Sequence, residues 1–150
     1  MDTLPVKIKL SRGMELPAYA TAGSAAVDLR AALEPGQTVT IEPGQTQVFP
    51  TGLSLSTGRS DVVAIVAARS GLGTRHGIVP ANGIGIIDSD YRGEIHVSLR
   101  NYSNVPFTVE RGDRIAQLMF MPVFCASFQA VDELDETARG TGGFGSTGLQ

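Results

Sequence analysis

Apolar and polar residues alternate along much of this 150-residue chain with the two-residue period of β-strands. The longest regular alternation is at 94–100, where three apolar positions share one face and three polar positions the other: Ile95, Val97 and Leu99 against His96, Ser98 and Arg100. The same pattern predicts further short strands at 6–10, 25–31, 39–41, 48–49, 53–55, 62–67, 107–109, 114–121 and 123–131. With 18 glycines and 8 prolines spread between them, these segments predict an all-β fold.

The stretch 83–101 predicts a β-hairpin, because a short apolar run and the alternating strand flank residues of turn composition. Its tip carries two carboxylates, a phenol and a guanidinium: Asp88, Asp90, Tyr91 and Arg92. Asp88 directly follows two isoleucines, at the end of a strand predicted to be buried, where burial would raise its basicity. Such a base could activate a water beside a ring-containing substrate. A plain Asx-turn explains the same residues, so both interpretations stay open on this stretch.

A five-residue repeat, Glu-Pro-Gly-Gln-Thr, occurs at 34–38 and again at 42–46. Each Pro-Gly pair is typical of a type II turn. Two copies around a three-residue strand predict a β-meander rather than a solenoid.

One short helical turn is predicted after the strand 62–67. Ser70 is a favourable N-cap residue there, Gly71 adjoins it, and Arg69 lies beside both. A helix N-terminus presents free N–H groups to an anion, although an ordinary capped turn has the same sequence.

Three polar residues stand out from their surroundings. Asp28 shares the polar face of its predicted strand with Arg30, and its small neighbours let another backbone approach closely; a solvated strand face is the alternative. Gln117 is the one polar side chain at 115–121, so it needs a hydrogen-bond partner, either backbone or a ligand phosphate. Asn82 suits the edge of a nucleobase but also a simple Asn-Gly turn.

The composition narrows the classes of protein. A chain of this length with 42% hydrophobic residues is expected to form one domain. A net charge of −3 argues against general nucleic-acid coating but leaves room for a local cationic pocket, since ten of the twelve basic residues are arginines. No apolar run is long enough to span a membrane and no signal peptide is recognisable. Cys125 is the single cysteine, which predicts a reducing, cytoplasmic location.

The C-terminal end changes composition after the last predicted strand. Acidic residues at 132–136 are followed by five glycines within 139–148, too many for a core element. We therefore predict a domain at 1–131 and a flexible arm at 132–150. The simplest interpretation of such an arm is a disordered tail. Arg139 supplies charge and Phe144 supplies a ring that can stack on a base, so the arm could also be a lid that becomes ordered when a nucleotide binds.

Together, five stretches resemble the ordered sequence motifs of the trimeric dUTP diphosphatases (dUTPases). They read AGSAAVDLRA, ARSGLG, NGIGIIDSDYRG, RGDRIAQLMF and RGTGGFGSTG, in that order from Ala22 to Gly148. Ala26 is the one departure, where the family pattern has glycine. The resemblance implies a distorted jelly-roll, β-clip-like barrel of mostly antiparallel strands, and a homotrimer with active sites at its subunit interfaces.

The resemblance also implies hydrolysis of dUTP to dUMP and diphosphate with Mg²⁺, which keeps uracil out of DNA and supplies dUMP for dTMP synthesis. Asp88 is then the general base for the water that attacks the α-phosphorus. Asp28 acts through the waters of the magnesium, which the triphosphate holds without direct protein ligands. The implied substrate contacts are Arg69, Ser70, Gly71, Asn82, Gly85, Ile87, Asp88, Tyr91, Gln117, Arg139, Phe144, Gly145, Ser146 and Thr147.

The resemblance assigns these contacts to parts of the nucleotide. Asn82 and nearby main chain read the uracil edge, and Tyr91 packs under the deoxyribose and excludes a 2′-hydroxyl. Arg69, Ser70 and Gly71 of the second motif and Gln117 of the fourth hold the phosphates. The arm reaches another subunit's site, where Phe144 stacks on uracil and Arg139, Ser146 and Thr147 close over the phosphates.

Two other functions remain open from the sequence. A dCTP deaminase, or a bifunctional deaminase, resembles the chain around 83–101, but that chemistry needs a glutamate on the strand after the turn. Ser98 stands at that position and Glu94 is too close to the turn. A non-catalytic β-sandwich binding module is the second alternative, and it gives no reason for Phe144 in a glycine-rich arm.

Overall fold

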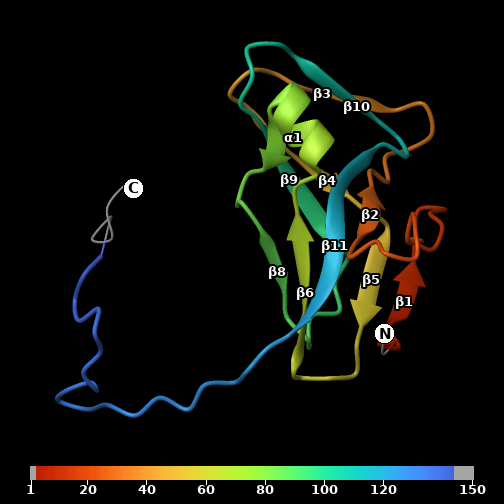
Figure 1. Cartoon of the computed structure of the whole chain (residues 1–150). Helices are drawn as coiled ribbons and strands as arrows, with labels where there is room; N and C mark the ends of the chain where they lie inside the picture. The colour runs from red at the N-terminus through yellow and green to blue at the C-terminus, as the bar shows by residue number, and fades with distance from the viewer. Residues whose placement is uncertain (1–2, 144–150) are drawn as a thin grey trace.

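The computed structural model describes residues 3–143. In this part of the chain, eleven short strands and one helix form an all-β body (Figure 1). The elements are β1 (Lys7–Leu10), β2 (Val27–Arg30), β3 (Thr38–Ile41), β4 (Thr46–Pro50), β5 (Leu53–Ser56), β6 (Val62–Ala67), α1 (Ser70–His76), β7 (Ile78–Pro80), β8 (Gly85–Ile87), β9 (His96–Asn101), β10 (Phe107–Glu110) and β11 (Arg114–Pro122).

All described strand pairs are antiparallel and form four small sheets. Two sheets matter for the site: β2-β11-β6-β8 and β4-β9-β7. The others are the pairs β1-β5 and β10-β3. Most partners are far apart in sequence, so the chain crosses repeatedly between sheets.

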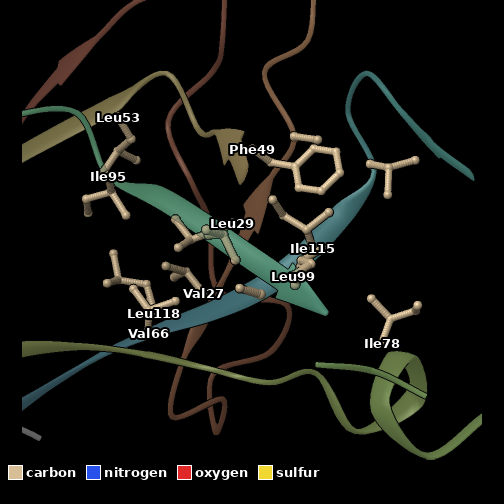
Figure 2. Packing of buried hydrophobic residues seen from close by; sticks show 14 of the residues in the cluster. Val27, Leu29, Phe49, Leu53, Val66, Ile78, Ile95, Leu99, Ile115 and Leu118 are labelled. Atoms are coloured by element: carbon tan, nitrogen blue, oxygen red, sulfur yellow. The ribbon is translucent and has the colours of Figure 1, made fainter. Parts of the chain in front are cut away.

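Apolar residues of these sheets form one buried cluster, because alternation sends every second side chain inward. Ile95, Val97 and Leu99 are each no more than 2% exposed, as the alternation at 94–100 predicted. Figure 2 shows Ile95 and Leu99 with side chains of β2, β4 and β11, including Leu29 and Phe49. The core thus fixes the positions of β9 and β11 relative to each other.

The two Pro-Gly turns form as predicted, but the meander does not. Gly36 and Gly44 have φ of 78° and 76°, the left-handed conformation that a type II turn requires. β3 pairs with β10, however, and β4 pairs with β9, so the two strands beside the repeat do not pair with each other. A turn is encoded locally, whereas distant segments decide which strand pairs with which.

The predicted hairpin at 83–101 is wrong for the same reason. β8 pairs with β6 and β9 pairs with β4 and β7, so the segment 88–95 crosses from one sheet to the other. β8 is an edge strand, and Ile86 is 54% exposed rather than buried. Asp88, at its end, is exposed as well. The expectation of a buried strand end is therefore not met in this chain.

The body ends with β11. The strand predicted at 123–131 is absent: these residues have no regular secondary structure and are exposed, with Phe124 and Phe128 almost fully so. After β11 the chain leaves the body as an extended segment (Figure 1). Its apolar residues explain the mistaken prediction, because they suit a strand but have no partner strand within residues 3–143.

Candidate functional site

Three strands bring one half of the predicted site together, around Asp28. β11 lies between β2 and β6, and Gln117 is level with Asp28 on one side and Ala67 on the other. Asp28 Oδ1 accepts a hydrogen bond from Arg69 Nε at 2.8 Å, and its Oδ2 accepts one from Arg114 Nη1 at 3.4 Å. We call Asp28, Arg69, Arg114 and Gln117 the charged cluster.

The charged cluster is partly withdrawn from solvent. The side chains of Asp28 and Arg69 are 22% and 23% exposed. Asp28 is thus an ion-paired residue rather than part of a freely solvated strand face. The Gln117 side chain, half-buried beside Asp28, makes no hydrogen bond within residues 3–143. Of the two partners considered for it, a backbone group is therefore not found.

The helix beside the charged cluster begins one residue earlier than predicted, because Ser70 was predicted to be the N-cap residue. Arg69 is the N-cap residue, with extended φ and ψ, and Ser70 is the first helical residue. An arginine side chain has no acceptor atom, so no side chain caps the first N–H groups. Ser70 and Gly71 are both exposed, next to Arg69 and the charged cluster.

The segment 88–95 carries the second half of the predicted site. The Tyr91 N–H donates to the Asp88 backbone oxygen at 3.1 Å, which closes a turn. The carboxylates of Asp88 and Asp90 accept no hydrogen bond in the described part of the chain. The Asx-turn interpretation is therefore wrong, because the turn is closed by backbone atoms and leaves both carboxylates free.

A small pocket of about 170 Å³ lies between β8 and β9. Asn82, Gly85 and Ile87, three predicted substrate contacts, line it together. Gly85 allows the close approach of β8, since a Cβ there would lie 3.1 Å from Val66 Cβ. The volume is below the roughly 300 Å³ of pockets for drug-sized ligands, so it suits a single ring. His96 also lines this pocket, although it was not predicted as a site residue. The sequence signal that could have identified it is its position on the polar face of the alternating strand at 94–100.

Asp88 lies apart from the charged cluster within one chain. Along β6, the charged cluster is level with Ala67, whereas Ile87 is level with Ala64 and Asp88 lies one position further. Four residue steps of a strand correspond to about 13 Å, without counting the sideways distance across the sheet. One chain therefore does not bring Asp88 to the charged cluster.

The arm is described only as far as Gly143. Arg139 Nε donates to the Gly142 oxygen at 2.8 Å within a local turn, in a segment outside the body. Phe144, Gly145, Ser146 and Thr147, also predicted as contacts, lie outside the described residues.

A larger cavity of about 590 Å³ adjoins the charged cluster and was not predicted. Asp28 and Arg114 line it together with Arg111 and the loop 13–20. Arg111 and Gly112 line the cavity and belong to an Arg-Gly-Asp sequence at 111–113. This sequence is part of a turn, in which an Asp113 carboxylate oxygen accepts a hydrogen bond from the Glu110 N–H at 2.9 Å.

Glu94 connects the segment 88–95 to the N-terminal loop. Its carboxylate accepts from Arg12 Nε at 3.0 Å and from the Gly52 N–H at 2.7 Å. Burial favours the neutral acid, but these two hydrogen bonds and the nearby positive charge outweigh it and hold the pKa of Glu94 below its usual value. Sequence reasoning missed this contact, because Arg12 and Glu94 are 82 positions apart.

Two properties of the described residues bear on cofactors and membranes. Within residues 3–143, no three histidine, cysteine or acidic side chains are grouped so that they could hold a metal ion. No helix in that same part of the chain has the length and apolar character needed to cross a membrane.

The fold and the divided site define an all-β protein with a ring-sized pocket and an arginine-rich cluster. A family profile described as dUTPase matches residues 12–148. The deoxyuridine 5′-triphosphate nucleotidohydrolase of Desulfitobacterium hafniense is 52% identical over 152 residues, covering 99% of each chain. That of Shewanella loihica is 53% identical, covering 90% of this chain and 88% of the relative. The chain therefore belongs to the dUTPase family.

Solved structures agree with this assignment. The dUTPase of Staphylococcus bacteriophage 80alpha with dUpNHpp matches with a TM-score of 0.86 and 25% identity, covering 98% of this chain and all of that one. The all-β, jelly-roll-like fold that the sequence motifs implied is thereby confirmed.

Proposed function

We propose that this chain hydrolyses dUTP to dUMP and diphosphate, with Asp88 as the general base. The observation that carries the mechanism is the free carboxylate of Asp88, directly after Ile87 in the wall of the small pocket. A base must be free to take a proton, and this one is exposed and accepts no hydrogen bond within the described residues. The family and its relatives' names support dUTP as the substrate.

The small pocket holds the nucleoside in this proposal. The uracil ring enters between β8 and β9, where the Asn82 side chain and main chain at Gly85 and Ile87 offer donors and acceptors for its edge. Tyr91 packs against the deoxyribose and leaves no room for a 2′-hydroxyl. The single-ring volume of the pocket supports a pyrimidine over a purine.

The charged cluster and the start of α1 hold the phosphates. Arg69 offers a guanidinium, Ser70 and Gly71 offer exposed hydroxyl and N–H groups, and Gln117 offers an amide without a protein partner among residues 3–143. A phosphate ligand supplies the partner that the half-buried Gln117 amide needs. Positioning and charge neutralisation are what phosphoryl transfer requires of a protein.

In the reaction, a water oxygen bonds to the α-phosphorus while the bond from that phosphorus to the oxygen bridging toward the β-phosphorus breaks. Diphosphate leaves, and Asp88 takes the proton of the water. The donor set fits a magnesium ion carried by the triphosphate: Asp28 is already shared between two arginines, so it would contact the ion through the ion's waters rather than directly. When bound, magnesium neutralises and orients the phosphate oxygens.

The separation of Asp88 from the charged cluster supports a site shared between copies of the chain. Asp88 and the small pocket of one copy would meet the charged cluster of the next, and three such contacts close a ring. The arm, which extends from the end of β11, would reach the site of another copy and close it with Arg139 and Phe144. This arrangement is a homotrimer in which no copy works alone.

We place the reaction in the cytoplasm, because the exposed thiol of Cys125 stays reduced there. The proposal includes no nucleic-acid or membrane partner.

The test is diphosphate release from dUTP with magnesium, measured beside dTTP, dCTP and UTP. We expect rapid release from dUTP alone. Release from UTP at a similar rate would contradict the role of Tyr91 in excluding a 2′-hydroxyl. Ammonia release from dCTP would favour the alternative that the chain is a deaminase. No reaction with any nucleotide, in folded protein, would contradict the proposed function.

A further inference from the structure

Glu94 fixes the position of Tyr91 through its own backbone. The Tyr91 hydroxyl donates to the Glu94 carbonyl oxygen at 3.0 Å. The ring lies directly against the backbone between them, since a Cβ added at Gly93 would be 2.3 Å from Tyr91 Oη and 2.5 Å from its Cζ. Where residues 93 and 94 lie therefore decides where the Tyr91 ring lies.

The Glu94 side chain ties this backbone to two loops on the body. One anchor is the Gly52 N–H, 2.7 Å from Glu94 Oε1, and Gly52 is itself tightly enclosed, because a Cβ there would meet Ser11 O at 2.8 Å. The other anchor is Arg12 Nε, 3.0 Å from the same oxygen. With only 19% of the Glu94 side chain exposed, both contacts are partly shielded from water.

Arg12 is held in place from its other side. The Arg111 guanidinium donates to the Arg12 backbone oxygen at 2.5 Å. Arg12 has φ of 53°, and within residues 3–143 it is the one non-glycine residue with positive φ. This conformation is unfavourable for a side chain with a Cβ and persists only where surrounding contacts impose it. The anchor for Glu94 is thus a constrained residue rather than a freely rotating surface arginine.

We propose that Arg12 and Glu94 are positioning residues for Tyr91, and that this pair tightens discrimination against ribonucleotides. The inference rests on the proposed function, because it concerns how the same site holds the sugar. Neither side chain touches the substrate: Arg12 fixes Glu94, Glu94 fixes the backbone, and the backbone fixes the tyrosine ring. Loosening the pair lets the ring move away from the sugar, which admits a 2′-hydroxyl and weakens the grip on dUTP.

A second ion pair in the chain provides a matched control. Arg59 and Asp61 are 2.6 Å apart, closer than Arg12 and Glu94, but both side chains are more than half exposed and they lie two positions apart in one loop. A surface pair of this kind contributes little and fixes no other segment. Arg59→Gln therefore removes the same charge as Arg12→Gln without disturbing Tyr91.

The experiment measures kcat and KM for dUTP and for UTP in four proteins: wild type, Glu94→Gln, Arg12→Gln and Arg59→Gln. For Glu94→Gln and Arg12→Gln we expect KM for dUTP to rise about threefold to tenfold with kcat nearly unchanged, and the preference for dUTP over UTP to fall by a similar factor. Arg59→Gln should match the wild type. Arg12→Lys, which restores the charge but not the planar fork, should recover part of the loss.

The double variant and a folding control make the result decisive. If the two residues act as one unit, Arg12→Gln with Glu94→Gln loses no more selectivity than either single change. Thermal unfolding confirms that each variant is folded, and Glu94→Gln keeps an acceptor for the Gly52 N–H, so it preserves that anchor. Unchanged KM and selectivity in both single variants, or an equal loss in Arg59→Gln, would overturn the inference and leave the proposed function intact. A wild type that hydrolyses no nucleotide would overturn both.

Discussion

The charged cluster and the segment 88–95 hold their charges in opposite ways. In the charged cluster, Asp28 is shared between two arginines before any ligand arrives. In the segment 88–95, the carboxylates of Asp88 and Asp90 accept no hydrogen bond within the described chain. An arginine that binds phosphate works best when it is held in position, whereas a base works only when its lone pairs are free. This contrast supports the proposal that the charged cluster binds phosphate and that the segment 88–95 supplies the base.

They also differ in what keeps them rigid. The charged cluster lies on the hydrogen-bonded strands β2 and β11 and at the N-cap of α1, two residues after β6 ends. The segment 88–95 has no strand of its own and is fixed by side-chain contacts, above all those of Glu94. Substitutions in the segment 88–95 should therefore alter chemistry or sugar selectivity while the fold stays intact.

Loss of the free carboxylate is expected to have the largest effect. Asp88→Asn should lower hydrolysis by about 10²-fold or more while nucleotide binding largely persists, because the amide cannot accept the proton of the water. Steady-state rates and binding by titration calorimetry with dUTP check both parts. Asp90→Asn is the matched control, since this acid is also exposed and lies in the same turn. Near-normal hydrolysis by Asp88→Asn would transfer the role of base to Asp90 or to a metal-bound water.

Removal of the arm tests whether catalysis requires the arm to close over the charged cluster. Deleting residues 139–150 should reduce activity about tenfold or more, because the phosphates lose contacts and water enters the site. The oligomer measured by light scattering should be unchanged, since the body ends at Pro122. An unchanged turnover rate would remove the arm from the mechanism.

A smaller effect is expected from filling the space under Tyr91. Gly93→Ala places a Cβ where the Tyr91 ring lies, so the ring must move and its hydrogen bond to Glu94 is lost. KM for dUTP should rise about threefold or more, and UTP should become a better substrate. Tyr91→Phe, which removes the hydroxyl without a clash, should cost less. Equal selectivity in Gly93→Ala and wild type would show that the ring position is unimportant.

The smallest effect concerns stability and its dependence on pH. The pKa of Glu94 is lowered in the folded chain, so its ionised form stabilises the fold above the unfolded pKa of about 4.3, and this contribution is lost as the pH falls through the folded value. Glu94→Gln should cost about 1 kcal/mol or less at pH 7, and the difference from wild type should shrink below about pH 4.

Chemical denaturation across this pH range checks the prediction for Glu94. The charged groups facing this carboxylate are Arg12 and His96, and Glu34 competes weakly for Arg12 at 3.6 Å. Glu42→Gln, at an exposed acid with no side-chain partner in the described residues, is the control. A difference between Glu94→Gln and wild type that stays constant with pH would argue against the ion pair.

Local features of the fold could be predicted from the sequence, whereas the pairing of the strands could not. The alternation at 94–100 gave β9 its buried face, and Pro-Gly gave both type II turns, because each depends on a few neighbouring residues. The hairpin, the meander and the last strand were wrong because strand partners are chosen by contacts across long stretches of chain.

The site divides in the same way. The motifs identified Asp28, Asn82 and Asp88 as candidates, since their residue types and spacing are visible in sequence. The Arg12–Glu94 contact was invisible, because nothing near either residue indicates the other. The separation of Asp88 from the charged cluster was also invisible, since it follows from the register of β8 and β11 on β6.

The most direct test of a site built from two copies is to mix two inactive variants. Asp88→Asn lacks the base, and Ser70→Ala with Gln117→Leu lacks phosphate contacts. If each site takes its halves from different copies, every mixed trimer has one intact site, and random mixing gives about a quarter of wild-type activity (three-quarters of trimers mixed, one site in three). The account predicts this recovery after the two variants are unfolded and refolded together. A mixture no more active than its parents would contradict it.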